Sequence, residues 1–146
     1  MPHACIGVDV IVGFPGETNE DFQETFDFLH GLDVSYFHVF TYSERINTPA
    51  IQLPGAVPMS VRRDRNEILR QLGEKKKHHF YHSHLNTCRS VLVEHDSALS
   101  DQGESQWCGF TDNYIRVHLN KKMAEPNHVI PLKLDRFNSF GEIQGV

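Results

Sequence analysis

The stretch of sequence that decides the fold is Gly7-Val-Asp-Val-Ile-Val-Gly-Phe-Pro-Gly-Glu-Thr18. Its first part belongs to a continuous β-branched run over residues 6–13, which is typical of a parallel strand buried on both faces. The run ends in a tight turn in which Gly13 and Gly16 permit backbone conformations that other residues avoid. The stretch therefore predicts a strand, a sharp turn and the start of a helix.

A helix and a second strand follow this turn. Thr18 can cap the helix, with Asp21 three residues later as the acidic partner of a capping box. Three apolar side chains with helical spacing share one face: Phe22, Phe26 and Leu29. We expect Gly31 to end the helix in a left-handed conformation. Residues 34–42 are predicted to form a second strand, which completes a right-handed βαβ unit.

The next segment contains a loop and a long helix. Residues 43–59 hold three prolines, which favours an irregular loop. Ser60 can cap a helix over about 61–83, and its apolar residues share a face: Val61, Ile68 and Leu72. The second half of this helix is basic, because three consecutive lysines precede two histidines at 78 and 79.

From residue 87 the sequence pattern is that of short strands. Residues 89–94 alternate around Val91 and Val93, residues 96–106 are polar and predict a hairpin loop, and residues 109–119 predict a strand pair or one bent strand. Residues 128–134 predict a further strand, in which Pro131 favours an edge or a bulge. The fold class is therefore an α/β partial (β/α) barrel segment over residues 1–83, followed by a small all-β antiparallel barrel over residues 84–146, of OB-like size.

Composition indicates a soluble globular protein with a local basic stripe. The 146 residues are 39% hydrophobic and 23% charged, and no apolar run approaches the length of a membrane span. The start of the sequence lacks the basic region and the cleavage site of a secretory signal. Residues 1–59 hold eight acids and one base (−7), residues 60–89 hold eight bases and three acids (+5), and residues 90–146 hold eight acids and five bases (−3). A basic middle between acidic ends favours a surface that faces an anionic partner.

The three cysteines predict neither a disulfide nor a metal site. Cys5, Cys88 and Cys108 are far apart and show no CxxC or CxxxCxxC spacing. Scattered thiols suit the reducing cytoplasm, where we expect this protein to reside. The histidines show no metal-binding spacing beyond His78, His79 and His82, which we interpret as surface residues.

Each candidate feature also has a plain structural interpretation. The turn after residue 12 is explained as a strand–helix corner with a capping acid, and the charges of the long helix as a solvated face. Tyr114 is interpreted first as a core aromatic of the barrel rather than as a stacking residue.

Three motifs in order nevertheless resemble one enzyme family. The motifs are the segment quoted above, His38-Val-Phe-Thr-Tyr-Ser-Glu-Arg-Ile-Asn-Thr-Pro-Ala50, and Gly109-Phe-Thr-Asp-Asn-Tyr-Ile-Arg-Val117. All three resemble segments of the MiaB-like radical S-adenosylmethionine tRNA methylthiotransferases, and the third resembles the TRAM domain of these enzymes. The combination is most similar to the branch that methylthiolates N6-threonylcarbamoyladenosine beside the anticodon. The family usually has Gly where this chain has Asn47, a residue that tolerates left-handed geometry.

The resemblance implies two sets of site residues. Residues that would line the S-adenosylmethionine site are Val10, Ile11, Val12, Gly13, Gly16, Glu17, Phe40, Tyr42, Ser43 and Arg45. The RNA-facing set, which combines the basic residues with the TRAM-like motif, is Arg62, Arg63, Arg65, Lys75, Lys76, Lys77, Arg89, Asn113, Tyr114 and Arg116. We expect Gly13 to leave space for the cofactor, and Glu17 to fix either the turn or the cofactor's polar edge.

The family's cluster-binding CxxxCxxC motif is not in this sequence. We therefore expect the chain to be the C-terminal piece of a longer enzyme that uses S-adenosylmethionine and [4Fe–4S] clusters. By itself it should hold no iron–sulfur cluster, bind no metal, contain no catalytic residue and be inactive. It should bind tRNA but no membrane, and it should expose strand edges through which it self-associates.

Two other functional classes stay open at this point. The chain could be a non-catalytic RNA-binding module on an α/β scaffold, or a structural α/β domain with neither activity. Salt-dependent affinity for tRNA separates the first two hypotheses from the third. A CxxxCxxC motif upstream of residue 1 would favour the enzyme over the module.

Overall fold

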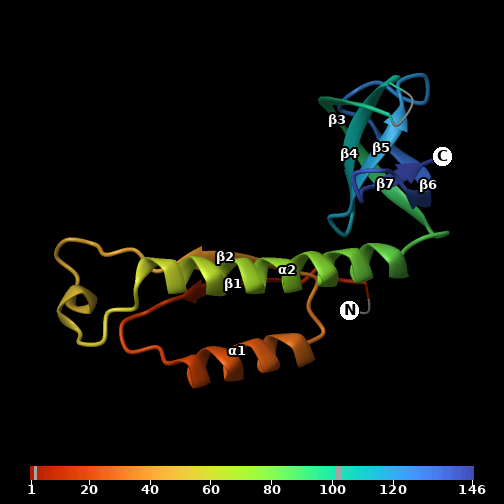
Figure 1. Ribbon diagram of the computed structural model, residues 1–146. Helices are drawn as coiled ribbons and strands as arrows, with labels where there is room; N and C mark the ends of the chain where they lie inside the picture. Colours follow the sequence, from red (N-terminus) through yellow and green to blue (C-terminus); the bar gives the residue numbers. More distant parts are fainter. Residues whose placement is uncertain (2, 101–102) are drawn as a thin grey trace. The chain divides into compact units, whose positions relative to one another are not determined.

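The computed structural model describes residues 1, 3–100 and 103–146, which divide into two compact units. Residues Ile6–Lys77 form one unit, which we call the βα unit, and Met1–Cys5 with His78–Val146 form the other, which we call the barrel unit (Figure 1). This division by contacts differs from the predicted domains 1–83 and 84–146, which stay a prediction.

The βα unit contains the predicted strand–helix–strand motif. Strand β1 (Gly7–Val12) pairs in parallel with β2 (Tyr36–Thr41), in a register that runs from Gly7 opposite Tyr36 to Val12 opposite Thr41. Helix α1 (Asn19–Gly31) connects the two strands (Figure 1). The helix begins with the predicted capping box, in which Thr18 and Asp21 bond each other's backbone N–H groups.

The end of α1 differs from the prediction. Gly31 is the last helical residue and does not adopt a positive φ, while Leu32 follows as an extended C-cap whose N–H donates to the Phe28 carbonyl. The left-handed cap predicted at Gly31 is therefore wrong. Because the chain leaves in an extended conformation, the turn needs no glycine-specific geometry.

Helix α2 (Met59–Ser83) follows a short 3₁₀ helix, η1 (Pro49–Gln52). The core of the βα unit consists of buried residues from β1, α1 and α2: Val12, Phe22, Leu29, Leu69 and Leu72. Ile68, which the sequence assigned to the buried face of α2, is 44% exposed, and Leu69 takes its place. The buried face of the helix is therefore shifted by one residue from the prediction. The helix has too few apolar residues for their spacing to define that face.

The two-stranded sheet is covered on one face only. Val8, Val10, Phe37 and Val39 pack with the helices, whereas the alternate positions of both strands are exposed or half-buried. The expectation that β1 is buried on both faces is therefore wrong within the described chain, although the helix side is buried as expected. The structure shows a βαβ segment with a second helix, and a (β/α) barrel stays a proposal.

The barrel unit is a closed five-stranded barrel with strand order β3-β4-β5-β7-β6. Its strands are β3 (Cys88–Leu99), β4 (Ser105–Thr111), β5 (Arg116–Asn120), β6 (Val129–Phe137) and β7 (Ile143–Gly145). Residues 109–119 are thus a strand pair. The small barrel is confirmed, but it is mixed rather than antiparallel, because β5 and β7 run in parallel.

The barrel core is apolar, and its buried strand residues come from β3, β5, β6 and β7. Its fully buried side chains include Val91, Val93, Val117, Leu134 and Ile143. The predicted hairpin loop joins β3 and β4 but is shorter than residues 96–106, since β3 continues to Leu99 and β4 begins at Ser105. Residues 101 and 102 lie outside the described residues. Pro131 lies within β6 opposite Ser90, as part of the closed barrel.

Candidate functional site

The turn after β1 is built around Glu17. Gly13 and Gly16 have φ values of +78° and +89°, which favour glycine. The Gly13 N–H donates to the Glu17 carboxylate, and the Gly16 N–H donates to the Gly55 carbonyl at 2.8 Å. Glu17 also forms an ion pair with Arg65 at 3.1 Å. Of the two roles expected for Glu17, these contacts support the one that fixes the turn.

Gly13 is required by the protein's own packing. A Cβ atom at this position would lie 2.3 Å from the Arg62 Cγ atom. The Arg62 side chain is pinned, because its guanidinium donates to the Val57 and Tyr42 carbonyls and to the Glu44 carboxylate at 2.7–2.9 Å. A side chain at Gly13 would therefore collide with Arg62, and the expectation that it would also occupy cofactor space stays a prediction.

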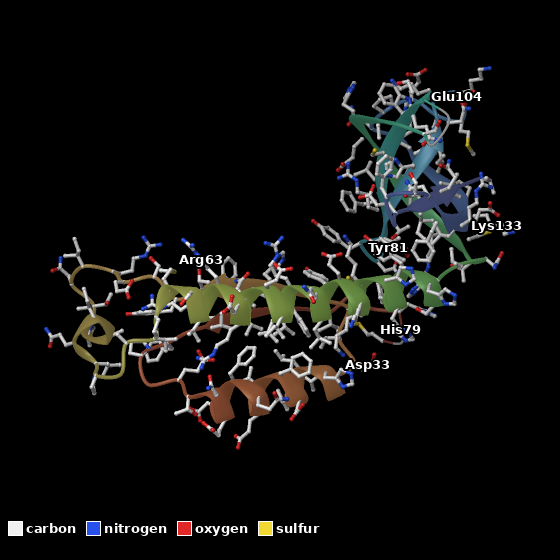
Figure 2. All side chains as sticks on the ribbon, in the orientation of Figure 1. Asp33, Arg63, His79, Tyr81, Glu104 and Lys133 are labelled. Atoms are coloured by element: carbon white, nitrogen blue, oxygen red, sulfur yellow. The ribbon has the colours of Figure 1, made fainter. Side chains whose placement is uncertain are left out.

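Arg62 and Arg65 lie inside the βα unit, 4% and 5% exposed. Arg65 donates to the Glu17 carbonyl and to the Asn19 side chain, and stacks over the Phe22 ring. The hydrogen bond from Arg62 lowers the pKa of the Glu44 carboxyl below its ordinary value. Both guanidiniums bind the protein's own oxygen atoms, so the structure contradicts an RNA-facing position for them. Arg63 is exposed and projects from the first turns of α2 (Figure 2).

The uncovered face of the sheet brings four side chains together. Ile11 lies opposite Phe40, and Asp9 lies opposite His38. Ile11 and Phe40 are 62% and 53% exposed, so two large apolar residues stand beside a carboxylate and an imidazole on an open surface. Large exposed apolar groups that adjoin polar ones mark ligand or protein contacts.

The residues predicted to line the cofactor site lie on both faces of this sheet. Ile11 and Phe40 lie on the open face, whereas Val12 is buried against the helices and Val10 packs on the same side. Sequence reasoning missed Asp9 and His38. Strict period-two alternation from Ile11 would have placed Asp9 on the same face.

Beyond β2 the remaining predicted residues line the loop. The Tyr42 N–H donates to the Val12 carbonyl at 2.8 Å, and its ring packs edge-to-face on Phe14. Ser43 and Arg45 are exposed. Asn47 has a φ of +71°, which confirms that asparagine supports the left-handed turn here.

The lysines of α2 differ in their surroundings. Lys75 is exposed, whereas Lys76 donates its Nζ protons to the His30 and Leu32 carbonyls at the end of α1. Lys77 is half-buried and makes an interaction of its own. Lys76 therefore stabilises the α1 terminus, and Lys75 is the lysine best placed to meet a phosphate.

The barrel unit carries the other predicted RNA-facing residues. Tyr114 is 63% exposed, so its interpretation as a core aromatic is wrong. Asn113 is buried, and its side-chain amide donates to the His3 carbonyl at 3.1 Å. The Arg116 Nε atom lies 3.5 Å from a carboxylate oxygen of Glu142. Arg89 lies 3.6 Å from Asp112.

Within the described residues, no three His, Cys, Asp or Glu side chains are grouped so that they could hold a metal ion. Cys88 is exposed, Cys5 is half-buried, and Cys108 is buried beside His118. No helix in this part of the chain has the length and apolar character that crossing a membrane requires. The chain's own residues do not fit an iron–sulfur cluster, which needs several thiolates at one place.

Comparison with known proteins gives consistent matches of one kind. The chain is 41% identical over 117 residues to threonylcarbamoyladenosine tRNA methylthiotransferase MtaB of Aquifex aeolicus, which covers 80% of this chain and 26% of that protein. It is 37% identical to the enzyme of the same name from Rickettsia prowazekii, over 84% of this chain and 27% of that protein. The chain is therefore similar in sequence to a portion of these tRNA methylthiotransferases.

A second group of these methylthiotransferases also matches. The tRNA-2-methylthio-N(6)-dimethylallyladenosine synthase of Coxiella burnetii (strain RSA 493 / Nine Mile phase I) is 32% identical over 145 residues, which is 97% of this chain and 32% of that protein. The chain thus spans about a quarter to a third of the length of the curated relatives it matches. No protein-family model matches it.

Proposed function

We propose that this chain is part of a tRNA methylthiotransferase, in which the βα unit contributes one wall of the catalytic barrel and the barrel unit binds tRNA. The observation that carries the proposal is the 32–41% identity to such enzymes over 80–97% of the chain. Identity at this level over both units argues against a chance likeness of one motif.

The open face of the β1–β2 sheet supports the catalytic part of the proposal. In a parallel α/β barrel, helices cover the outside of the sheet and the other face lines the interior. Here the helices cover the side of Val12, so Ile11, Phe40, Asp9 and His38 would face the interior. A barrel closed by further strands would bury the two apolar side chains that the described chain leaves exposed.

These residues fit an S-adenosylmethionine site in chemical character. Ile11 and Phe40 offer an apolar wall for an adenine ring, and Asp9 offers an acceptor for a cationic or hydroxyl group. Bound there, the cofactor would supply the radical chemistry of such enzymes. The chain's own contribution would be to bind and orient: Arg62 and Glu17 hold the turn at the carboxyl end of β1, which fixes the wall before binding.

We assign the substrate to N6-threonylcarbamoyladenosine in tRNA. Relatives whose names contain threonylcarbamoyladenosine are 34–41% identical to this chain in sequence. Relatives whose names contain dimethylallyladenosine are 32–40% identical to it. The combination of the three motifs quoted above also favours the first group. The margin is small, so the experiment must read both nucleosides.

The test is the nucleoside content of tRNA from cells in which the gene that encodes this chain has been inactivated. We expect the 2-methylthio derivative of N6-threonylcarbamoyladenosine to disappear in mass spectrometry, while its unmodified form accumulates. Loss of the 2-methylthio group from dimethylallyladenosine instead would overturn the substrate assignment but keep the enzyme class. No change in either nucleoside would overturn the proposed function.

A further inference from the structure

The turn between β4 and β5 presents an exposed aromatic pair. Tyr114 is 63% exposed, and its ring stacks on Phe110 with 4.9 Å between centroids and 24° between planes. Aromatic side chains contribute much of the buried area of protein cores and of interfaces. Here the underlying ring supports one face of Tyr114, which leaves much of the tyrosine exposed to solvent.

The backbone holds this ring in an unfavourable conformation. Tyr114 has a φ of +67°, a region that bulky residues rarely adopt. Three contacts fix it: the Tyr114 N–H donates to the Thr111 carbonyl, the Ile115 N–H donates to the Thr111 hydroxyl, and that hydroxyl donates to Asn113. Thr111 and Asn113 are both buried, so the turn is rigid. Strained residues held by their surroundings gather at ligand sites.

A cation stands beside the aromatic pair. The Arg116 guanidinium carbon lies 5.8 Å from the centre of the Phe110 ring, and its Nε atom lies 3.5 Å from Glu142. Glu142 is itself bonded to His118, which is 2% exposed. The buried histidine therefore positions the glutamate, and the glutamate positions the arginine next to the stacked rings.

We propose that Tyr114, backed by Phe110, is the stacking platform for one unpaired RNA base, and that Arg116 contacts the phosphate next to that base. Exposed bases stack on aromatic side chains, and arginine binds the adjoining phosphate. A rigid platform loses little conformational freedom when a base binds. That the RNA is tRNA rests on the proposed function; the platform itself requires only single-stranded RNA.

The test compares this 146-residue chain with two variants in which an exposed aromatic residue becomes asparagine. Tyr114→Asn removes the ring but suits the positive φ, since asparagine tolerates this region. Phe140→Asn is the matched control, because Phe140 is 70% exposed on the turn between β6 and β7. The probe is a short single-stranded RNA with 2-aminopurine at one position, whose fluorescence falls when the base stacks.

We expect wild type and Phe140→Asn to quench the probe and to bind it equally. Tyr114→Asn should lose the quenching and bind about 5-fold to 150-fold more weakly, which corresponds to the about 1–3 kcal/mol typical of one stacked base. The midpoint temperature of thermal unfolding of Tyr114→Asn should equal or exceed that of wild type. Tyr114→Phe should keep the binding, because it keeps the ring.

Three results would overturn the platform. The first is unchanged affinity in Tyr114→Asn, the second is an equal loss in Phe140→Asn, and the third is a wild-type chain that does not bind the probe. If Tyr114→Asn instead abolishes self-association in sedimentation, without any effect on RNA, the surface belongs to a protein contact. Quenching through Tyr114 with unchanged tRNA nucleosides in cells would keep the platform and remove the proposed function.

Discussion

Substitution of Gly13 by alanine should destabilise the βα unit through Arg62. The added Cβ would lie 2.3 Å from the Arg62 Cγ atom, and the far end of that side chain cannot swing away without breaking its bonds to Val57, Tyr42 and Glu44. A positive φ costs a non-glycine residue about 1–2 kcal/mol. Overpacking of this kind adds about 1–3 kcal/mol. Together these two costs predict that Gly13→Ala lowers the free energy of unfolding by about 2–5 kcal/mol.

Gly16→Ala separates the two contributions. Gly16 has a similar φ of +89°, but nothing lies within 4 Å of its added Cβ. It should therefore lose only the conformational part, about 1–2 kcal/mol. The double variant Gly13→Ala/Arg62→Ala should be less destabilised than the two single losses predict, because the collision has been removed.

Urea unfolding measures these losses, with helix content by circular dichroism as the main probe. The single tryptophan, Trp107, lies in the barrel unit, so its fluorescence serves as an internal control that should shift little. Equal losses in Gly13→Ala and Gly16→Ala would refute the role of Arg62. So would strict additivity in the double variant.

Two further predictions concern the charged residues of the βα unit. Because the hydrogen bond from Arg62 lowers the folded-state pKa of Glu44, this ion pair stabilises the fold above the ordinary glutamate range and is lost as the pH falls through the lowered value. Glu44→Gln should therefore flatten the fall of the urea midpoint as the pH drops below the ordinary glutamate pKa of about 4.3, and an unchanged profile would argue against it. Lys75→Ala should lower the slope of log K for tRNA binding against log salt by up to about 0.9. Lys76→Met should mainly reduce the stability of the fold, because Lys76 binds the His30 and Leu32 carbonyls. Equal effects of the two variants on the salt slope would contradict this difference.

Local patterns predicted the elements of this fold well. The continuous β-branched run over residues 6–13 predicted the first strand of the βα unit, and Thr18 with Asp21 predicted the start of α1. Short strands between turn residues predicted the small barrel. These features depend on neighbours in the sequence, which is why sequence reasoning reaches them.

Features that depend on distant partners were not predictable. Arg62 and Arg65 look like surface charges until Glu44 and Glu17 are placed beside them, 18 and 48 positions away in the sequence. The parallel pairing of β5 and β7 follows from closure of the barrel, which no single segment encodes. The strain and exposure of Tyr114 likewise depend on buried contacts of the turn.

The open face of the β1–β2 sheet is the center of the proposed function, and a matched pair of variants tests it. Ile11→Asp alters that face, whereas Ile68→Asp alters an exposed isoleucine on α2. Within the described chain Ile11 is 62% exposed and Ile68 is 44% exposed, so this chain should fold with about wild-type stability in both variants. The polar group at residue 11 would, however, disrupt the apolar wall proposed for the cofactor.

The decisive measurement is the amount of 2-methylthio-N6-threonylcarbamoyladenosine in tRNA after the inactivated gene is replaced by each variant at equal protein level. We predict that wild type and Ile68→Asp restore this nucleoside and that Ile11→Asp does not. Full restoration by Ile11→Asp would contradict the assignment of this face to the catalytic site.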